Sequence, residues 1–206
     1  KIKTYKNYKK YPYMDLNADY WTSRYENNQS PWDLGSVSPP LQKYIETLTD
    51  HSLKILSPGG GNCYEIEYLY QKGFLNTYLV DISPLPIKNI QNRNPAIPST
   101  HLICGDFFEH TDTYDLILEQ TFFCALNPNL RKAYVTQMHR LLKPGGKLVG
   151  LLFDAPLNTD QPPFGGNAQE YTSLFSTDFV IQKMEPCDNS IQPRAGRELF
   201  VEFISK

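Results

Sequence analysis

Three glycines and a later aspartate are the residues whose types and spacing first indicate chemistry. Gly59, Gly60 and Gly61 follow a short apolar run, and Asp81 closes a second apolar run about twenty residues further on. A glycine turn after a strand lets the backbone approach a ligand closely, and a carboxylate after the next strand can accept hydrogen bonds from both hydroxyls of a ribose. This spacing therefore predicts a binding site for a ligand that contains a nucleoside.

The same segment carries no signature of a phosphate site. A dinucleotide-binding fingerprint would place a third glycine at position 64, where the chain has Tyr64, and the GK[ST] sequence of a phosphate-binding loop is absent. A nucleoside without phosphates fits better, and S-adenosylmethionine is the common cofactor of that kind. A nicotinamide-dependent reductase is the alternative that Tyr64 argues against.

A second acidic position follows the third apolar run. In "ICGDFF" Asp106 comes directly after the run, where it could accept a hydrogen bond from an adenine amino group while Phe107 lies against the ring. On its own, Asp106 could equally be the cap of a turn. Because Asp81 and Asp106 each close a predicted strand at the same edge of a sheet, a ligand site is favoured over a cap.

Strands that alternate with helices must position these residues. The first five predicted strands are 53–57, 77–81, 101–104, 114–119 and 147–153, and the predicted helices are 62–72, 86–92, 128–142 (capped by Asn127) and 168–175. Strands at 179–185 and 198–204 have no helix between them. The pattern predicts an α/β fold: a doubly wound, mostly parallel seven-stranded sheet with helices on both faces. It ends in an antiparallel hairpin whose final strand lies at the sheet edge.

Composition narrows the class of protein further. The chain has 206 residues, enough for one domain with a real core, and its net charge is −2 without a strongly basic block, so nucleic acid is not an expected partner. No CxxC spacing indicates a metal or redox motif. The sequence has neither a signal-like segment nor an apolar run of membrane-spanning length, so we expect a cytoplasmic protein without a membrane partner.

Several segments resemble the class I S-adenosylmethionine-dependent methyltransferases. Among these they look like the thiopurine S-methyltransferase family, which includes the halide/thiol (thiocyanate) methyltransferases. "YWTSRYENNQSPWDLGSVSP" is similar to the N-terminal signature of that family, "LSPGGGNCYEIEYL" to its glycine loop and "VDIS" to its ribose-binding strand end. "GDFF", "YDLILEQTFFCALNPNLRKAYVTQMHRLLKPGG" and "QPPFGG" resemble its later motifs. The resemblance spans roughly residues 18 to 175.

The resemblance implies a Rossmann-like fold, with residues 1–36 as an aromatic lid and 37–206 as the methyltransferase domain. It implies that the following residues contact the cofactor: Trp21, Tyr25, Trp32, Gly59, Gly61, Asp81, Ile82, Asp106, Phe107 and Gln120. Core packing is the alternative role of the two tryptophans. The chain departs from plant-type members at Tyr25, where they have Trp, and at Glu119-Gln120, where they have an Asp-Tyr pair. Since Gln120 could face the reacting centre, the departure leaves the choice of methyl acceptor open.

Methyl transfer from a sulfonium is an in-line displacement that needs alignment and an electron-rich nucleophile. The sequence offers no Ser/His/Asp triad and no metal cluster, and "EQTFFCAL" predicts an apolar pocket rim, so the expected acceptor is a small soft nucleophile: a thiol, bisulfide, thiocyanate or a halide. Arg194 and Arg197 precede the last strand. Either could hold an anionic acceptor, and for each the alternative is a surface ion pair with Glu198 or Glu202.

Three further readings stay open. The same cofactor could serve another small acceptor: an aromatic thiol or thiopurine, a selenium or arsenic species, or an oxygen or nitrogen nucleophile. The chain could instead be a non-catalytic nucleoside-binding module that kept the fold. The sequence also leaves open whether the protein is a monomer or a homodimer.

Overall fold

One seven-stranded sheet runs through the protein in the computed structural model, which describes residues 14–206. The strands are β1 (Ile55–Pro58), β2 (Thr77–Asp81), β3 (Leu102–Cys104), β4 (Tyr114–Gln120), β5 (Leu142–Phe153), β6 (Phe179–Pro186) and β7 (Glu198–Ser205). Their order is β3-β2-β1-β4-β5-β7-β6. Neighbours among β1 to β5 pair in parallel, whereas β7 is antiparallel to both β5 and β6. The predicted α/β, mostly parallel sheet with an antiparallel C-terminal hairpin is confirmed.

The predicted place of the last strand is wrong. β7 lies between β5 and β6, and β6 forms the edge of the sheet. Leu199, Val201 and Phe203 of β7 are buried, whereas β6 exposes Lys183 and Glu185, and charged side chains are typical of an edge strand. Helix α6 (Ala168–Phe175) lies between β5 and β6 in the chain and leaves a place beside β5 that the returning β7 fills.

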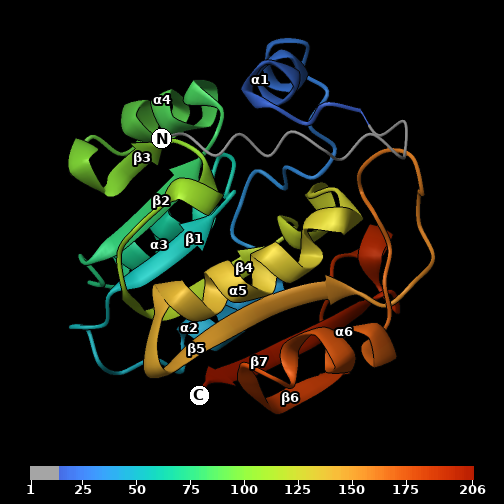
Figure 1. The fold of residues 1–206 in the computed structure, drawn as a ribbon. Helices are drawn as coiled ribbons and strands as arrows, with labels where there is room; N and C mark the ends of the chain where they lie inside the picture. Colours follow the sequence, from blue (N-terminus) through green and yellow to red (C-terminus); the bar gives the residue numbers. More distant parts are fainter. Residues whose placement is uncertain (1–13) are drawn as a thin grey trace, which may run out of the picture.

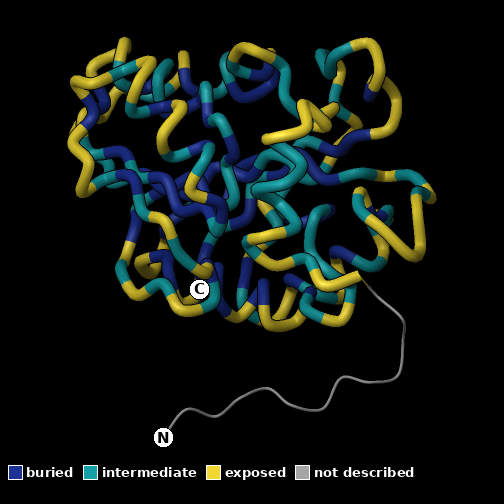
Figure 2. Tube along the Cα trace, turned by 90° about the horizontal axis from the view of Figure 1, so that it is seen from above, coloured by how far each residue is buried: buried dark blue, intermediate teal, exposed yellow. Residues whose placement is uncertain are grey.

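Helices cover both faces of the sheet (Figure 1). Neighbouring strand residues such as Ile55 and Leu56 point to opposite faces and enter two separate cores. One core packs against α5 (Arg131–Leu141) and α6, and the other against α2 (Pro39–Ile45), α3 (Tyr64–Gln71) and α4 (Pro84–Arg93). In Figure 2 the buried trace accordingly runs through the middle of the molecule, beneath an exposed outer layer.

Two helices near the N-terminus have no counterpart among the predicted elements. Helix α1 (Ala18–Glu26) begins at Asn17, whose side chain accepts a hydrogen bond from Tyr20 N at 3.0 Å, and α2 begins with two prolines after Ser38. None of the residues of α1 is buried, so its sequence lacks the periodic apolar face that identifies a core helix. The first 13 residues of the predicted lid lie outside the described part of the chain.

The carboxyl ends of the parallel strands meet at one edge of the sheet, and α1 lies there with α4 as its neighbouring helix (Figure 1). A hydrogen bond of 2.9 Å between Thr22 Oγ1 and Ser83 Oγ joins α1 to the turn that begins α4. The predicted helix from Pro128 is divided into a short 3₁₀ turn (Pro128–Leu130) and α5, with Asn127 as the cap of the turn. None of the helices within residues 14–206 is long and apolar enough to cross a membrane.

Candidate active site

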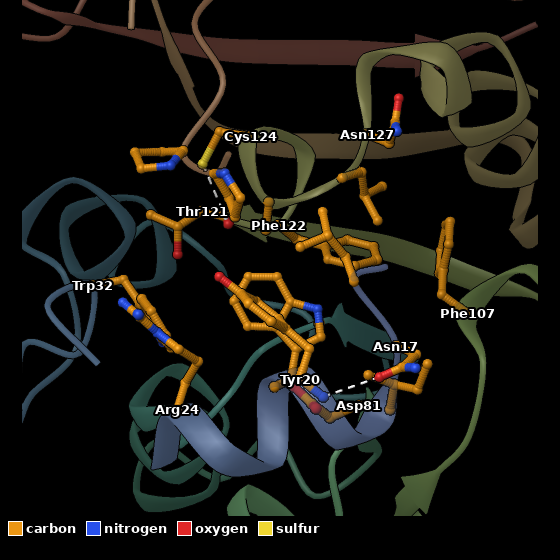
Figure 3. A pocket seen from close by; sticks show the side chains of 18 of the residues that line it. Asn17, Tyr20, Arg24, Trp32, Asp81, Phe107, Thr121, Phe122, Cys124 and Asn127 are labelled. Atoms are coloured by element: carbon orange, nitrogen blue, oxygen red, sulfur yellow. Dashed lines mark hydrogen bonds between the residues drawn. The ribbon is translucent and has the colours of Figure 1, made fainter. Parts of the chain in front are cut away.

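A cavity of about 610 Å³ lies between α1 and the carboxyl ends of the strands. Small-molecule sites typically enclose about 300–1,000 Å³, so a ligand of cofactor size and a small second molecule both fit. Figure 3 shows side chains that converge on this cavity from α1, from the end of β2 and from the segment after β4. The residues predicted from sequence that line it are Trp21, Tyr25, Trp32, Gly59, Asp81, Ile82, Asp106, Phe107 and Arg194.

The glycine turn after β1 needs its glycines. Gly59 and Gly61 have positive φ angles of 55° and 56°, which side chains other than glycine rarely adopt. A Cβ atom on Gly59 would lie 2.0 Å from the ring of Phe122, and one on Gly61 would lie 2.6 Å from the hydroxyl of Tyr25. Gly61 does not line the cavity itself. Its N–H instead donates to Asp81 Oδ2 at 2.9 Å.

Asp81 is a buried carboxylate at the end of β2. Its Oδ1 accepts a hydrogen bond from Ser83 N at 2.8 Å, so each of its oxygens is held by one backbone N–H. Burial raises the pKa of Asp81 from 3.8 to about 6, and the two N–H donors partly oppose that rise. A carboxylate oxygen has acceptor capacity beyond one hydrogen bond, so Asp81 can still accept from the hydroxyl groups of a ligand.

Asp106 is both a cap and a wall residue of the cavity. Its Oδ1 accepts a hydrogen bond from Phe108 N at 2.8 Å, which fixes the turn after β3, and no described residue bonds to its Oδ2. The ring of Phe107 beside it packs edge-on against the ring of Phe122, with ring centroids 5.1 Å apart. Both roles considered for Asp106 are therefore compatible, because the capped turn presents the residue to the cavity.

Aromatic rings from α1 and the following loop form the lid side of the cavity. The ring centroids of Trp21 and Trp32 are 5.5 Å apart, and those of Tyr25 and Trp32 are 5.8 Å apart. Tyr20 also lines the cavity and was not predicted. Tyr20 and Trp21 are adjacent in α1, and Tyr25 lies about one helical turn after Trp21. This spacing of aromatic residues was the sequence signal that could have identified Tyr20. Aromatic faces attract cations such as a sulfonium.

Arg194 also lines the cavity and lies near Cys124. It is only 8% exposed, and its guanidinium donates to the carbonyl oxygen of Trp32 at 3.0 Å and lies 3.8 Å from Glu198. Arg194 therefore fits both of its expected roles, because it pairs with Glu198 and also lines the cavity. Arg197 is exposed and does not line the cavity.

Gln120 lies outside the large cavity, in a recess of about 40 Å³ that Trp32, Gly60 and Thr121 also line. Its Oε1 accepts a hydrogen bond from Ser38 Oγ at 2.9 Å, and its Nε2 is buried without a hydrogen-bond partner. Thr121 lines both spaces and has a positive φ of 59°. Residues with backbone strain of this kind are common at functional sites.

Glu119, the residue before Gln120, faces away from the cavity. It is 1% exposed and accepts hydrogen bonds from Phe122 N at 2.8 Å, from Phe123 N at 3.0 Å and from the hydroxyl of Tyr134. Burial raises the pKa of Glu119 to about 7. Its carboxylate holds the segment after β4 in place and so fixes one wall of the cavity.

These residues fit S-adenosylmethionine. The Asp81 carboxylate can take ribose hydroxyls, the Asp106-Phe107 pair can meet a flat base, and the aromatic rings of the lid suit a sulfonium cation. Among residues 14–206, no group of three or more His, Cys, Asp or Glu side chains could hold a metal ion.

Solved structures share this fold. A structure from work on the conversion of a disulfide bond into a thioacetal group during echinomycin biosynthesis has a TM-score of 0.74 at 16% identity, over 92% of this chain and 93% of that chain. The Burkholderia thailandensis 1,6-didemethyltoxoflavin-N1-methyltransferase, solved with S-adenosylhomocysteine, has a TM-score of 0.73 at 15% identity, over 92% of this chain and 86% of that chain.

Sequence comparisons define the family. The model of the thiopurine S-methyltransferase family matches residues 16–203. Probable thiol methyltransferase 2 of Arabidopsis thaliana is 29% identical over 184 residues, covering 86% of this chain and 81% of the relative, and thiocyanate methyltransferase 1 of the same plant is 26% identical with the same coverage. The thiopurine S-methyltransferase of Photobacterium profundum is 24% identical over 179 residues, covering 78% of this chain and 83% of the relative.

The chain therefore belongs to the thiopurine S-methyltransferase family and is an S-adenosylmethionine-dependent methyltransferase. The predicted family, cofactor and enzyme class are confirmed. The alternatives of a nicotinamide-dependent reductase and of a non-catalytic nucleoside-binding module are wrong.

Proposed function

We propose that this enzyme methylates a small soft nucleophile: a thiol, bisulfide, thiocyanate or a halide. The observation that carries the proposal is the lining of the cavity, to which the described residues contribute no histidine, lysine or glutamate. Burial also raises the pKa of Cys124 to about 12, so its thiol stays protonated at neutral pH. The carboxylates of the described lining are Asp15, Asp81 and Asp106, and we assign Asp81 and Asp106 to the cofactor. A nucleophile that arrives already anionic needs no general base.

When bound, S-adenosylmethionine would supply a methyl group on a sulfonium cation: the bond from the nucleophile to the methyl carbon forms as the bond from the sulfonium breaks, and S-adenosylhomocysteine leaves. Asp81 would accept hydrogen bonds from the ribose, and Asp106 and Phe107 would hold the base. Trp21, Tyr25 and Trp32 would face the sulfonium and exclude water, which strengthens the electrostatic interactions inside the site. These contacts align the methyl group, and alignment is the main requirement of the reaction.

Arg194 is the residue that we assign to the acceptor. It is buried, it lines the cavity near Cys124, and its guanidinium can hold an anionic nucleophile. Gln120 is a second candidate, because its buried Nε2 lacks a partner near the glycine turn and could donate to the amino-acid part of the cofactor or to the acceptor.

An aromatic thiol is the second candidate acceptor. Apolar side chains of Leu126, Leu130 and Phe153 line the cavity, and they suit an aromatic ring. An aromatic thiol acceptor also agrees with the name of the bacterial relatives, thiopurine S-methyltransferase.

An acceptor panel separates these candidates. The purified protein and S-adenosylmethionine would be incubated separately with iodide, bisulfide and thiocyanate, with headspace detection of volatile methylated products, and with an aryl thiol, with detection by chromatography. We expect product from at least one of the anions. The absence of product from every anion, with S-adenosylhomocysteine still bound, would overturn the proposal, and product from the aryl thiol alone would favour the second candidate.

Two arginine variants form a matched pair for the same assay. Arg194→Gln removes the guanidinium that lines the cavity, and Arg197→Gln removes an exposed one that lies three residues further on. We expect Arg194→Gln to raise the KM for an anionic acceptor by about tenfold or more, because charge-assisted hydrogen bonds are among the stronger ones. Arg197→Gln should leave the KM within about twofold, since changes to exposed side chains have small effects.

The state of the cysteines supports a cytoplasmic location, which we also propose. Cys63, Cys104, Cys124 and Cys187 are all free thiols. Free thiols are typical of proteins that work in a reducing compartment.

A further inference from the structure

Arg24 of α1 is a cavity residue that the sequence did not single out. One of its terminal nitrogens donates to Gln29 Oε1 at 3.3 Å, and its Nε is buried without a hydrogen-bond partner. No carboxylate among residues 14–206 lies within 4.0 Å of its charged nitrogens. A partly buried guanidinium with a single neutral partner has donors to spare, and it is less stable than one that faces an anion.

A second guanidinium contacts the same residue, Trp32. The Arg24 Cζ atom is 5.8 Å from the centroid of the Trp32 ring, and Arg194 donates to the Trp32 carbonyl oxygen at 3.0 Å. Figure 3 shows Arg24 and Trp32 next to each other on one side of the cavity, away from Asn127 and Phe107. The carboxylate of Glu198 lies 3.8 Å from Arg194, and the buried Glu65 also interacts with Arg194.

Carboxylates and guanidiniums both line the cavity. Asp81 and Asp106 lie at the strand ends that suit the adenosyl part of the cofactor, whereas Arg24 and Arg194 line the end of the cavity beside Trp32, which both of them contact. A guanidinium is weakly hydrated and binds carboxylates through paired donors, so this end of the cavity suits a soft anion or a carboxylate group.

We propose that Arg24 and Arg194 together bind the anionic acceptor, or a carboxylate that the acceptor carries, and that this shared contact fastens α1 over the site. The inference deepens the proposed function and rests on it. Arg24 belongs to α1, whereas Arg194 precedes β7 in the body of the protein. An anion held by both links the lid to the body, so the anion and the cofactor must bind cooperatively, each tightening the other by the same factor.

Calorimetric binding of S-adenosylhomocysteine tests this linkage without turnover. Its Kd would be measured in sodium thiocyanate and in sodium chloride at equal ionic strength. We expect thiocyanate to tighten binding several-fold in the native protein and not in Arg24→Gln, while Arg24→Lys, which keeps the charge, retains part of the effect. Lys88→Gln, which removes an exposed cation from α4 outside the cavity, should behave like the native protein.

The cofactor's own carboxylate is the competing source of the anion, and the same assay distinguishes it. Methylthioadenosine lacks the amino-acid group of S-adenosylhomocysteine. If Arg24→Gln weakened S-adenosylhomocysteine in chloride while leaving methylthioadenosine unchanged, Arg24 would bind the cofactor carboxylate and the proposal would be overturned. An equal thiocyanate effect in the native protein and in Arg24→Gln would overturn it as well.

Two matched thiols supply the kinetic test. Mercaptoacetate carries a carboxylate and mercaptoethanol does not. We expect Arg24→Gln to raise the KM for mercaptoacetate by about tenfold with little change in kcat, and to change the KM for mercaptoethanol by less than about twofold. Equal effects on both thiols would contradict the proposal. If the native protein methylated neither thiol nor any anion, the proposed function would fail, while the thiocyanate linkage would still decide the role of Arg24.

Discussion

Asp81 shows how one residue serves binding at the expense of stability. It is 7% exposed and its carboxylate is held by two backbone N–H groups, yet its pKa lies at about 6, above the ordinary value of 3.8. A raised pKa means that burial disfavours the charged form more than the two hydrogen bonds favour it. The ionised carboxylate nevertheless is the form that accepts hydrogen bonds from ribose hydroxyls.

The affinity for S-adenosylhomocysteine should therefore fall at acidic pH. As the pH drops through about 6, Asp81 takes up a proton and loses acceptor capacity, so the Kd should rise by up to tenfold per pH unit below that value. Calorimetry between about pH 5 and pH 8, a range that spans the pKa of Asp81, measures the effect. Asp81→Asn should bind weakly at every pH with a flat profile, and a flat profile in the native protein would refute the assignment.

The stability of the protein should change with pH in the opposite sense. Because the folded pKa of Asp81 is raised, the native state binds more protons than the unfolded state between about pH 4 and pH 6, so the free energy of unfolding falls as pH rises through this window. We expect this fall to be smaller in Asp81→Asn than in the native protein, since the ionised carboxylate costs about 3 kcal/mol at pH 8 and the amide does not ionise. Thermal unfolding of both proteins at pH 4 and pH 8 checks this, and an equal change of Tm in the two would contradict it.

Glu119 has a raised pKa of about 7 for the same reason, but its carboxylate serves the fold. We expect Glu119→Gln to be stable at pH 8, because the amide oxygen can still accept from Phe122 N and Phe123 N. Glu119→Leu should lose about 1–3 kcal/mol for each buried donor left without an acceptor. Both variants would be compared by urea unfolding. Equal stability of the two would show that the hydrogen bonds of Glu119 contribute nothing.

At the scale of the element, the glycine turn after β1 and the segment after β4 form one unit. Gly59 has a positive φ and its Cα faces the ring of Phe122, so an added methyl group meets both backbone strain and a clash. We expect Gly59→Ala to weaken S-adenosylhomocysteine binding by more than tenfold and to lower the Tm. Differential scanning fluorimetry with and without ligand measures both effects.

A second substitution separates the two causes. The double variant Gly59→Ala/Phe122→Ala removes the ring that the new methyl group would meet, while the positive φ of residue 59 remains. If the clash dominates, the double variant should be more stable than the sum of the two single changes predicts. Strict additivity would assign the loss to backbone strain instead.

The sequence predicted most of the elements whose side chains enter the core, and the exception is α2, which buries Leu41 and Ile45. The range of β2 agrees with its prediction residue for residue, as does that of α6, because both have apolar patterns bounded by turn residues. Helix α1 could not be found in this way, since it buries none of its residues and its rings line a cavity instead of a core. The place of β7 also could not be found, because a hairpin pattern does not say on which side of β6 the chain returns.

The site was predictable where a strand end fixed it. Asp81 ends β2 and Asp106 lies two residues after β3, so both reach the cavity edge that the pattern indicated. Gln120 also ends a strand, but it points into the neighbouring recess and Glu119 points into the core, and the spacing of two adjacent residues cannot tell which one faces a ligand. Arg24 gave no sequence signal, because a lone arginine in a polar helix is usually solvated.

At the scale of the whole molecule, a rigid sheet carries a lightly attached lid. The two cores lie on the faces of the sheet, whereas α1 contributes no buried residue to either. Few polar contacts attach the described part of this lid, residues 14–36, to the body. They include the bond of Thr22 to Ser83, that of Asp33 to Asn62, and that of the Trp32 carbonyl to Arg194. Segments with few buried contacts open at a lower free energy than the core does.

The lid should therefore be the part of the described chain that the cofactor stabilises most. We expect the amides of Ala18–Glu26 to exchange hydrogen much faster than those of α5 in the free protein, because five or more residues of α5 are buried and none of α1 is. S-adenosylhomocysteine should slow exchange in α1 strongly and in α5 little, since its sulfur and amino-acid parts would contact Trp21, Tyr25 and Trp32. Adding thiocyanate should slow hydrogen exchange in α1 further in the native protein but not in Arg24→Gln. If neither ligand changed the exchange of α1, the lid would be part of the rigid body.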